Sequence, residues 1–351
     1  MNSMKDDEFA QDYLQSHFNT SAVVSTLSLR LSLCKIANFA QGGVKHELLS
    51  ILGYKKTNEI KPSYEDLEEL LNTLKSIDFI LFNRIFVNYT NEFTKTFLST
   101  EFGVRVDKVG FKYSDTATSF INKLIDGATY KRITDVIETR DIHNETSLIA
   151  VNVAYLKVRL PGKSRLICDK RSTLNSDSTT VINMKLASAG ASVTIVIPID
   201  MESLKDFLNN LDKPNFFRKI KSRMRFELVD IELPRFKIKT AIEWTDSLKK
   251  IGLKTIFLKN TTDLSSVLKE TSQDRHVYLS KVKQKNFLQV DEMGVLRQEP
   301  QDELKPKPAD QRFAMYATAD RPFYFSISLH FDRSDYLNVE DLFSGIYFGP
   351  E

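Results

Sequence analysis

The sequence predicts an α+β fold in one large domain. Helical patterns come first along the chain and strand patterns follow, which is typical of this class. The 351 residues are 42% hydrophobic, so they can bury a large core. No Gly/Ser-rich or Pro-rich linker divides them. We therefore expect residues 1–351 to form a single domain.

Apolar residues that recur at helical spacing predict a series of helices. In the first, Phe9–Phe18, the residues at this spacing are Phe9, Tyr13, Leu14 and Phe18. Val23–Phe39 is strongly apolar and includes a helical pattern around Cys34. The other predicted helices are Lys45–Leu52, which Gly53 ends, Glu65–Ile77, Phe93–Thr100 and Met201–Leu211.

Short runs of β-branched and aromatic residues predict the strands. Ser147–Leu156 is almost continuously apolar, as expected of a strand that is covered on both faces. Asn152 lies in this run and must be hydrogen-bonded to be tolerated there. The other predicted strands are Phe79–Val87, Val181–Leu186, Ala191–Pro198, Phe226–Ile238, Phe287–Val290 and Phe323–Leu329.

About two dozen residues between the last two strands have no regular periodicity, which is long for a loop in a compact domain. Loops of this length are usually functional or disordered.

Composition and motifs exclude several classes. A net charge of +3 argues against nucleic-acid binding, and no run of 18 apolar residues predicts a membrane span. His46-Glu47 begins a zinc-protease motif, but Ser50 occupies the place of the second histidine. Cys34 and Cys168 form neither a disulfide framework nor a metal set. Without a nucleophile, phosphate-loop or dinucleotide motif, we expect no enzyme and no cofactor.

Several segments resemble the serpins, among them the following. Asn152–Lys157 is similar to their Asn-Ala-Ile-Tyr-Phe-Lys strand, and Leu233–Phe236 to Leu-Pro-Lys-Phe. Val290–Gly294 resembles the start of their hinge, and Ala319–Phe325 the strand after their reactive loop. Leu342–Pro350 resembles their last strand, and the matches are collinear.

The resemblance implies a large central, mainly antiparallel sheet with about eight or nine helices. It also implies a second, barrel-like sheet, which we expect to be shortened because the similarity thins between Pro161 and Asp200. Residues 294–320 would form the exposed reactive loop.

The hinge departs from the family pattern. In inhibitory serpins the cleaved loop inserts as a new central strand, and alternate side chains enter the core. From Val295 this alternation sends charged or polar side chains inward, at Arg297, Glu299, Gln301 and Glu303. Each unpaired charge would cost several kcal/mol, and Pro300 lacks an amide hydrogen. The expected hinge residues are Glu292, Gly294, Val295, Arg297, Glu299 and Pro300.

The family also has a polar cluster under the central sheet, called the shutter, which governs its opening. Its positions match Ser25, Ser28, Asn152 and Gln284, with Gln284 in place of a histidine. An amide both donates and accepts, so Gln284 can serve in such a cluster. The alternative is ordinary hydrogen bonding of core residues. Val158 and Leu160 stand where the family has Gly and the tryptophan that anchors the top of the sheet.

The scissile bond has two candidate positions. Counting back from Pro322 places it near Gln311, Arg312 and Phe313, and Arg312 would suit a trypsin-like pocket. Counting forward from Gly294 places it at Pro308-Ala309. The target protease stays undetermined.

Two sets of surface sites are also predicted. The first is a basic cluster of Arg218, Lys219, Lys221, Arg223 and Arg225. The cluster could bind sulfated polysaccharide or could be a solvated face, and we favour the solvated face. Sequons for glycosylation lie at Asn19, Asn88, Asn144 and Asn260. Met1–Glu8 lacks the apolar segment of a signal peptide. We therefore expect an extracellular protein if a signal peptide was removed and a cytoplasmic protein otherwise.

We therefore expect a monomeric protease-binding protein whose reactive loop engages a serine or papain-like cysteine endopeptidase, with impaired trapping. The alternative is a non-inhibitory serpin that acts as a carrier, chaperone or storage protein.

Overall fold

The computed structural model describes residues 6–74, 78–161, 163–174, 179–186, 191–211, 213, 216, 219–220, 224–272, 275–293, 315–332 and 335–350. Within these residues it has eight α-helices: α1 (Asp6–Ser16), α2 (Thr26–Phe39), α3 (Gly42–Leu52), α4 (Ile60–Thr73), α5 (Lys95–Leu98), α6 (Ser114–Ala128), α7 (Met201–Leu208) and α9 (Thr245–Lys250). No helix among them has the length and apolar character needed to cross a membrane.

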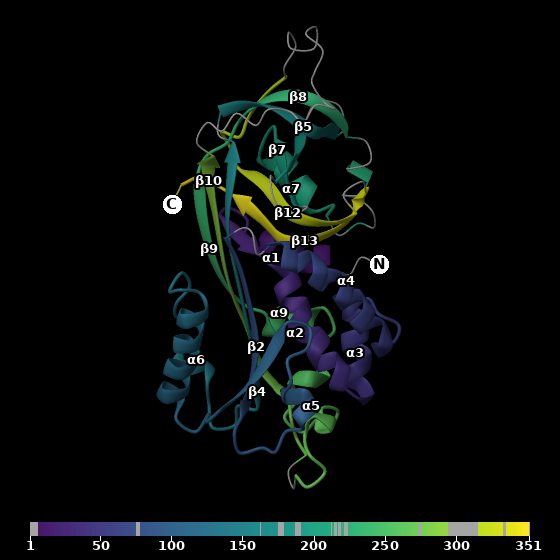
Figure 1. The fold of residues 1–351 in the computed structure, drawn as a ribbon, viewed down its shortest axis with the longest axis vertical. Coiled ribbons are helices and arrows are strands. Elements are labelled where there is room, and N and C mark those ends of the chain that lie inside the picture. The colour runs from purple at the N-terminus through teal and green to yellow at the C-terminus, as the bar shows by residue number, and fades with distance from the viewer. Residues whose placement is uncertain are drawn as a thin grey trace.

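The five strands β3 (Val104–Val109), β2 (Asp78–Asn88), β4 (Leu148–Pro161), β10 (Leu279–Met293) and β9 (Phe236–Glu243) form one sheet in that order. It is mixed: β2 is antiparallel to β4 and β9 to β10, whereas β3 is parallel to β2 and β10 to β4. The sheet runs along most of the long axis of the molecule (Figure 1).

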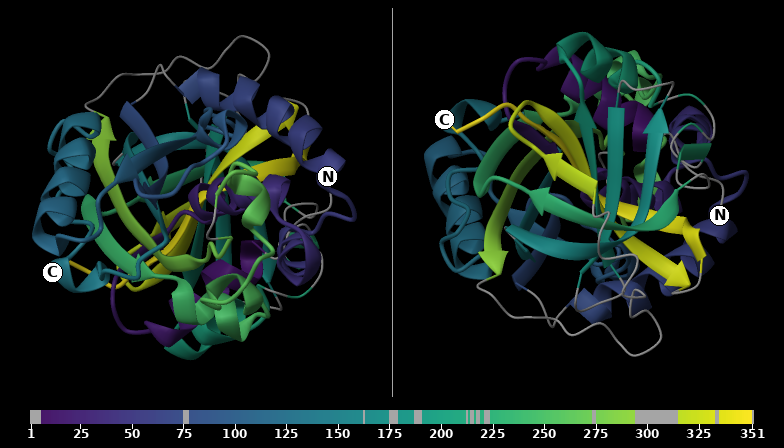
Figure 2. Two further views of the ribbon diagram at one scale, coloured as in Figure 1. Left: turned by 90° about the horizontal axis from the view of Figure 1, so that it is seen from below. Right: turned by 90° about the horizontal axis from the view of Figure 1, so that it is seen from above.

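The second sheet holds eight strands in the order β1 (Ala22–Val24), β13 (Asp335–Tyr347), β12 (Phe323–Asp332), β7 (Ala191–Pro198), β6 (Thr179–Lys185), β5 (Lys163–Leu174), β8 (Arg225–Glu232) and β11 (Met315–Thr318). Every pairing in it is antiparallel except β11 with β8. It curves across the upper half of the molecule (Figures 1 and 2). The predicted α+β class is therefore confirmed, and the thin resemblance around β5 to β7 does not remove the second sheet.

Helices cover both faces of the five-stranded sheet. α6 lies on one face, and α2, α3, α5 and α9 lie on the other (Figures 1 and 2). We call the α6 side the outer face and the α2 side the inner face. Nearly all of α2 is buried, which fits its apolar sequence. The main hydrophobic core fills the inner side, and a smaller core lies between the outer face and α6.

Several predicted boundaries need correction. The predicted strand Phe226–Ile238 is two strands, β8 and β9, which belong to different sheets. Pro234 lies in the break, where the missing amide hydrogen and fixed φ end the ladder. The predicted helix Met201–Leu211 ends at Leu208, and the short strand Phe287–Val290 is part of the much longer β10. α3 ends as predicted at Gly53, which has a left-handed φ of 73°.

Candidate functional site

The candidate site is the pairing of β4 with β10, which we call the seam. These two central strands are parallel, and their register runs from Leu148 with Leu279 to Pro161 with Met293. Since they are parallel, the chain needs a long crossover to join them, and no hairpin holds their ends together. The predicted loop begins directly after β10, and the chain is next described at β11.

A polar row crosses the inner face at the middle of the seam. Asn83, Asn152 and Gln284 are register partners on β2, β4 and β10, and all three are buried. Below them, Ser28 of α2 donates to Asn83 Oδ1 at 2.6 Å and Ser32 to Asn152 Oδ1 at 2.5 Å. These bonds tie α2 to the two strands on one side of the seam.

Gln284 makes a different set of bonds on the other side of the seam. Its Nε2 donates to the Ser25 carbonyl at 2.7 Å. Its Oε1 accepts from Trp244 Nε1 and from Asn286 Nδ2, both at 3.1 Å. Asn286 Nδ2 also donates to the Val23 carbonyl at 3.0 Å.

The predicted shutter residues therefore lie under one sheet but form two groups. Ser28 and Asn152 belong to the α2 group, whereas Ser25 and Gln284 belong to the Trp244 group. Sequence reasoning missed four members: Asn83, Ser32, Trp244 and Asn286. Asn83 could have been found, because it interrupts an apolar strand just as Asn152 does.

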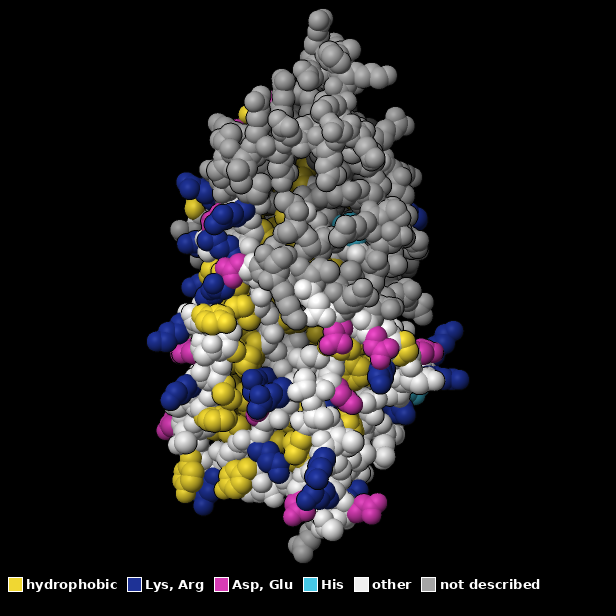
Figure 3. All heavy atoms as spheres, viewed as in Figure 1, with side chains coloured by type: hydrophobic (Ala, Val, Ile, Leu, Met, Phe, Trp, Pro, Cys, Tyr) yellow, Lys and Arg dark blue, Asp and Glu magenta, His cyan; other side chains and the backbone are white. Residues whose placement is uncertain are grey.

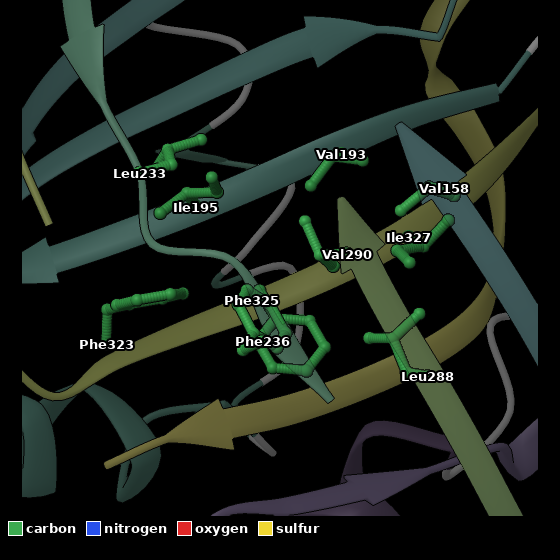
Figure 4. A pocket seen from close by; sticks show the side chains of 10 residues that line it. All are labelled: Val158, Val193, Ile195, Leu233, Phe236, Leu288, Val290, Phe323, Phe325 and Ile327. Atoms are coloured by element: carbon green, nitrogen blue, oxygen red, sulfur yellow. The ribbon is translucent and has the colours of Figure 1, made fainter. Parts of the chain in front are cut away.

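The upper seam is apolar on its inner face. Val158 of β4 and Leu288 and Val290 of β10 point toward β7, β12 and Phe236 (Figure 4). They line a cavity of about 10 Å³, and every residue around it is apolar. A polar side chain that entered here would find no side-chain hydrogen-bond partner.

Aromatic and charged groups cross the seam on its outer face. Tyr155 of β4 and Phe287 of β10 are register partners, and their rings stack with centroids 5.1 Å apart. Lys239 of β9 lies over the other side of the Phe287 ring, with Nζ 5.4 Å from its centroid. Lys157 pairs with Asp291 at 3.0 Å. Lys and Arg side chains are frequent along the left side of the molecule in Figure 3.

The connection from α6 to β4 is also bound to β10. Asp141 pairs with Lys281 at 2.8 Å and with Lys283 at 2.9 Å, and Lys285 Nζ donates to the Thr134 carbonyl at 2.6 Å. Burial raises the pKa of Asp141, but hydrogen bonds from Lys281, the Glu138 amide and Lys283 outweigh it and hold the pKa below 3.8. Asp141 is therefore a buried carboxylate.

Most of the other predicted site residues lie outside the described residues. These are the scissile-bond candidates Gln311, Arg312, Phe313, Pro308 and Ala309, the hinge residues Gly294, Val295, Arg297, Glu299 and Pro300, and the basic residues Arg218, Lys221 and Arg223. Only the backbone of Glu292 and Arg225 is described, and Lys219 is exposed. Of the sequon asparagines, Asn19, Asn144 and Asn260 are exposed and Asn88 is partly buried. Among the described residues, no group of His, Cys, Asp and Glu is arranged to hold a metal ion.

Comparisons with known proteins show the family and the fold of the chain. The sequence model of a family described as serpin (serine protease inhibitor) matches residues 4–163 and 168–337. Alaserpin of Manduca sexta is 24% identical over 336 residues, 88% of this chain and 85% of the relative. The human leukocyte elastase inhibitor is 23% identical over 344 residues, 87% of this chain and 88% of the relative.

Solved structures show the same fold. Native protease nexin-1 with heparin has a TM-score of 0.79 at 17% identity, with 98% of each chain covered. Uncleaved ovalbumin has a TM-score of 0.80 at 16% identity, with 99% of this chain and 98% of that chain covered.

Proposed function

The chain belongs to the family described as serpin (serine protease inhibitor), and from this premise we propose that it binds an endopeptidase through its reactive loop but traps it poorly. In this proposal residues 1–351 act as one domain and residues 294–320 as the loop. The target is a serine or papain-like cysteine protease.

The apolar lining under the upper seam is the observation that carries the proposal. A strand that entered between β4 and β10 would place alternate side chains beside Val158, Leu288 and Val290, pointing with them toward the apolar residues of β7 and β12. The cavity of about 10 Å³ has no room for an arginine side chain. Large charged side chains would therefore displace packed core residues as well as lose their hydration.

The hinge supplies such side chains. Its alternation places Arg297 and Glu299 among the inward positions, at a cost of several kcal/mol for each unpaired charge. Pro300 has no amide hydrogen for the new central strand to donate. Insertion would therefore be slow or incomplete, and the protease would complete its hydrolysis before it was distorted.

Limited cleavage followed by thermal unfolding tests the proposal. The protein is incubated with trypsin-like, elastase-like and papain-like proteases, and cleavage within Leu296–Phe313 is mapped by mass spectrometry. We expect cleavage without an SDS-stable complex, and little rise in melting temperature afterwards. The matched variant Arg297→Thr, Glu299→Ala, Pro300→Ala supplies small side chains at the first two inward positions and the missing amide, so its cleaved form should melt at a clearly higher temperature.

A stable complex with the wild-type chain would contradict impaired trapping, as would a melting shift equal to that of the triple variant. If no protease engages the loop at all, the non-inhibitory carrier, chaperone or storage role replaces this proposal.

A further inference from the structure

The outer core under α6 holds the two sides of the seam unequally. Its buried residues come from β2, β4, α6 and the segments around β3 and after α6, with one exception, Phe287 of β10. Among the described residues, β9 contributes none. The strands β3, β2 and β4 with α6 therefore form one packed unit, which reaches across the seam through a single apolar side chain.

Phe287 is well held in this position. It is 8% exposed, and its ring lies between Tyr155 and the Lys239 ammonium group. Tyr155 is fixed in turn, because its hydroxyl donates to Asp78 at 3.2 Å and the Arg132 guanidinium lies 4.6 Å from its ring centroid. Stacked aromatic pairs and cations over rings add stabilisation beyond the buried area.

Opening the seam would break this stack completely. A strand inserted between β4 and β10 moves them apart by one further strand spacing, about 4.8 Å. The two rings would then be about 10 Å apart, beyond the range of stacking. The other contacts across the outer face are polar, and those that water reaches contribute less. The buried pairs of Asp141 with Lys281 and Lys283 are stronger, but they lie near the start of β10, before Phe287.

We propose that Phe287 is the latch of the seam: its insertion beside Tyr155 into the outer core sets the barrier to separating β4 from β10. The proposal rests on the proposed function only in taking the seam as the place where a strand enters.

A matched pair of alanine variants tests the latch. Phe82 of β2 lies in the same outer core, is 6% exposed and has the Arg84 guanidinium 4.8 Å from its ring centroid. Phe82 keeps its neighbours in the packed unit when the seam opens. Phe287 belongs to β10, so it must withdraw from that unit. The two substitutions thus remove the same ring from the same core, and only one of them acts on the seam.

The probe is a synthetic peptide of alternating threonine and alanine, about as long as β4, which supplies small inward side chains in place of the chain's own loop. Uptake is followed by native mass spectrometry and by the fluorescence of Trp244, the only tryptophan. Phe287→Ala should speed uptake by at least about tenfold, which corresponds to a barrier lower by about 1.4 kcal/mol. Phe82→Ala should leave the rate within about threefold of wild type, a change of less than about 0.7 kcal/mol.

Phe287→Leu covers the case in which the alanine variant does not fold. It keeps most of the apolar volume but loses the stacking, so it should speed uptake by a smaller factor than alanine. Equal acceleration by Phe82→Ala and Phe287→Ala would overturn the latch, because the effect would then be general destabilisation. Failure of every variant to take up the peptide would overturn it too, since the seam would not open. Because the peptide replaces the loop, this comparison stays informative even if the cleaved loop inserts and the proposed function is wrong.

Discussion

Trp244 donates its indole N–H to the side-chain oxygen of Gln284, 3.1 Å away in the buried centre of the molecule. Gln284 also donates to the Ser25 carbonyl before α2, so one amide joins β10, the residue between β9 and α9, and the start of α2. Because the Gln284 side chain is a neutral amide, its position holds no titrating group. The polar cluster beneath the seam therefore has one part that holds α2 and another that holds Trp244.

Gln284→Leu should lower the free energy of unfolding by about 3 kcal/mol, because it leaves the Trp244 N–H and the Ser25 carbonyl without their partner. Urea unfolding followed by Trp244 fluorescence measures the loss, and the native emission maximum should shift as well. Gln289→Leu is the control: Gln289 is only half-buried on the same strand, and its amide bonds Asp291. A loss at Gln284 no larger than that at Gln289 would show that the buried bonds do not matter.

The sequence predicts the residues of the polar row better than their partners. Asn152 and Gln284 are adjacent across the seam, yet Asn152 binds Ser32 and Gln284 binds the Ser25 carbonyl. The direction in which α2 crosses the strands decides this pairing, and local pattern does not encode that direction. Ser28 and Ser32 are four residues apart on α2, so this spacing could have added Ser32 to the predicted residues.

The break at Pro234 shows the same limit. Apolar residues recur at short intervals from Phe226 to Ile238, so periodicity alone predicts one strand. Pro234 marks the place where the chain leaves one sheet for the other. Because proline is disfavoured within a central strand, its position could have divided the predicted strand in two.

Glu340→Ala should lower the free energy of unfolding by about 3–5 kcal/mol. Arg30 of α2 and Glu340 of β13 form an ion pair at 2.6 Å with side chains 6% and 7% exposed. Removing one partner leaves the other charge buried. Chemical denaturation measures the loss, and the double variant Arg30→Met, Glu340→Leu should lose less than Glu340→Ala alone because it removes both charges. Simple addition of the single losses would contradict this coupling.

Lys35→Met should remove a rise in stability at alkaline pH. Lys35 is fully buried and donates to the Ser99 carbonyl at 2.7 Å. Burial lowers its pKa below 10.5, outweighing the Glu101 carboxylate, so the folded state releases this proton before the unfolded state does. Between the folded pKa and 10.5 the unfolded state binds more protons, and stability therefore rises with pH.

Denaturation midpoints across the range below 10.5 measure this effect, as the difference between wild type and Lys35→Met. Lys281→Met is the control: burial lowers the pKa of Lys281, but its bonds to Asp141 and Glu243 outweigh burial and raise it, so its slope lies above 10.5 and has the opposite sign. A constant difference between wild type and Lys35→Met would contradict the prediction.

Asp141→Asn should lower the free energy of unfolding at neutral pH by about 3 kcal/mol, because Lys281 and Lys283 lose their buried carboxylate. The folded pKa of Asp141 lies below the ordinary 3.8, so its contribution is present above that value and disappears as pH falls through the folded pKa. The gap between wild type and variant should therefore close in the acid range below 3.8. Asp246→Asn is the control, since this side chain is 88% exposed and its pair with Lys249 contributes less than about 1 kcal/mol. A gap that persists through acid denaturation would show that the asparagine disturbs packing, and that the charge of Asp141 does not hold the α6 connection to β10.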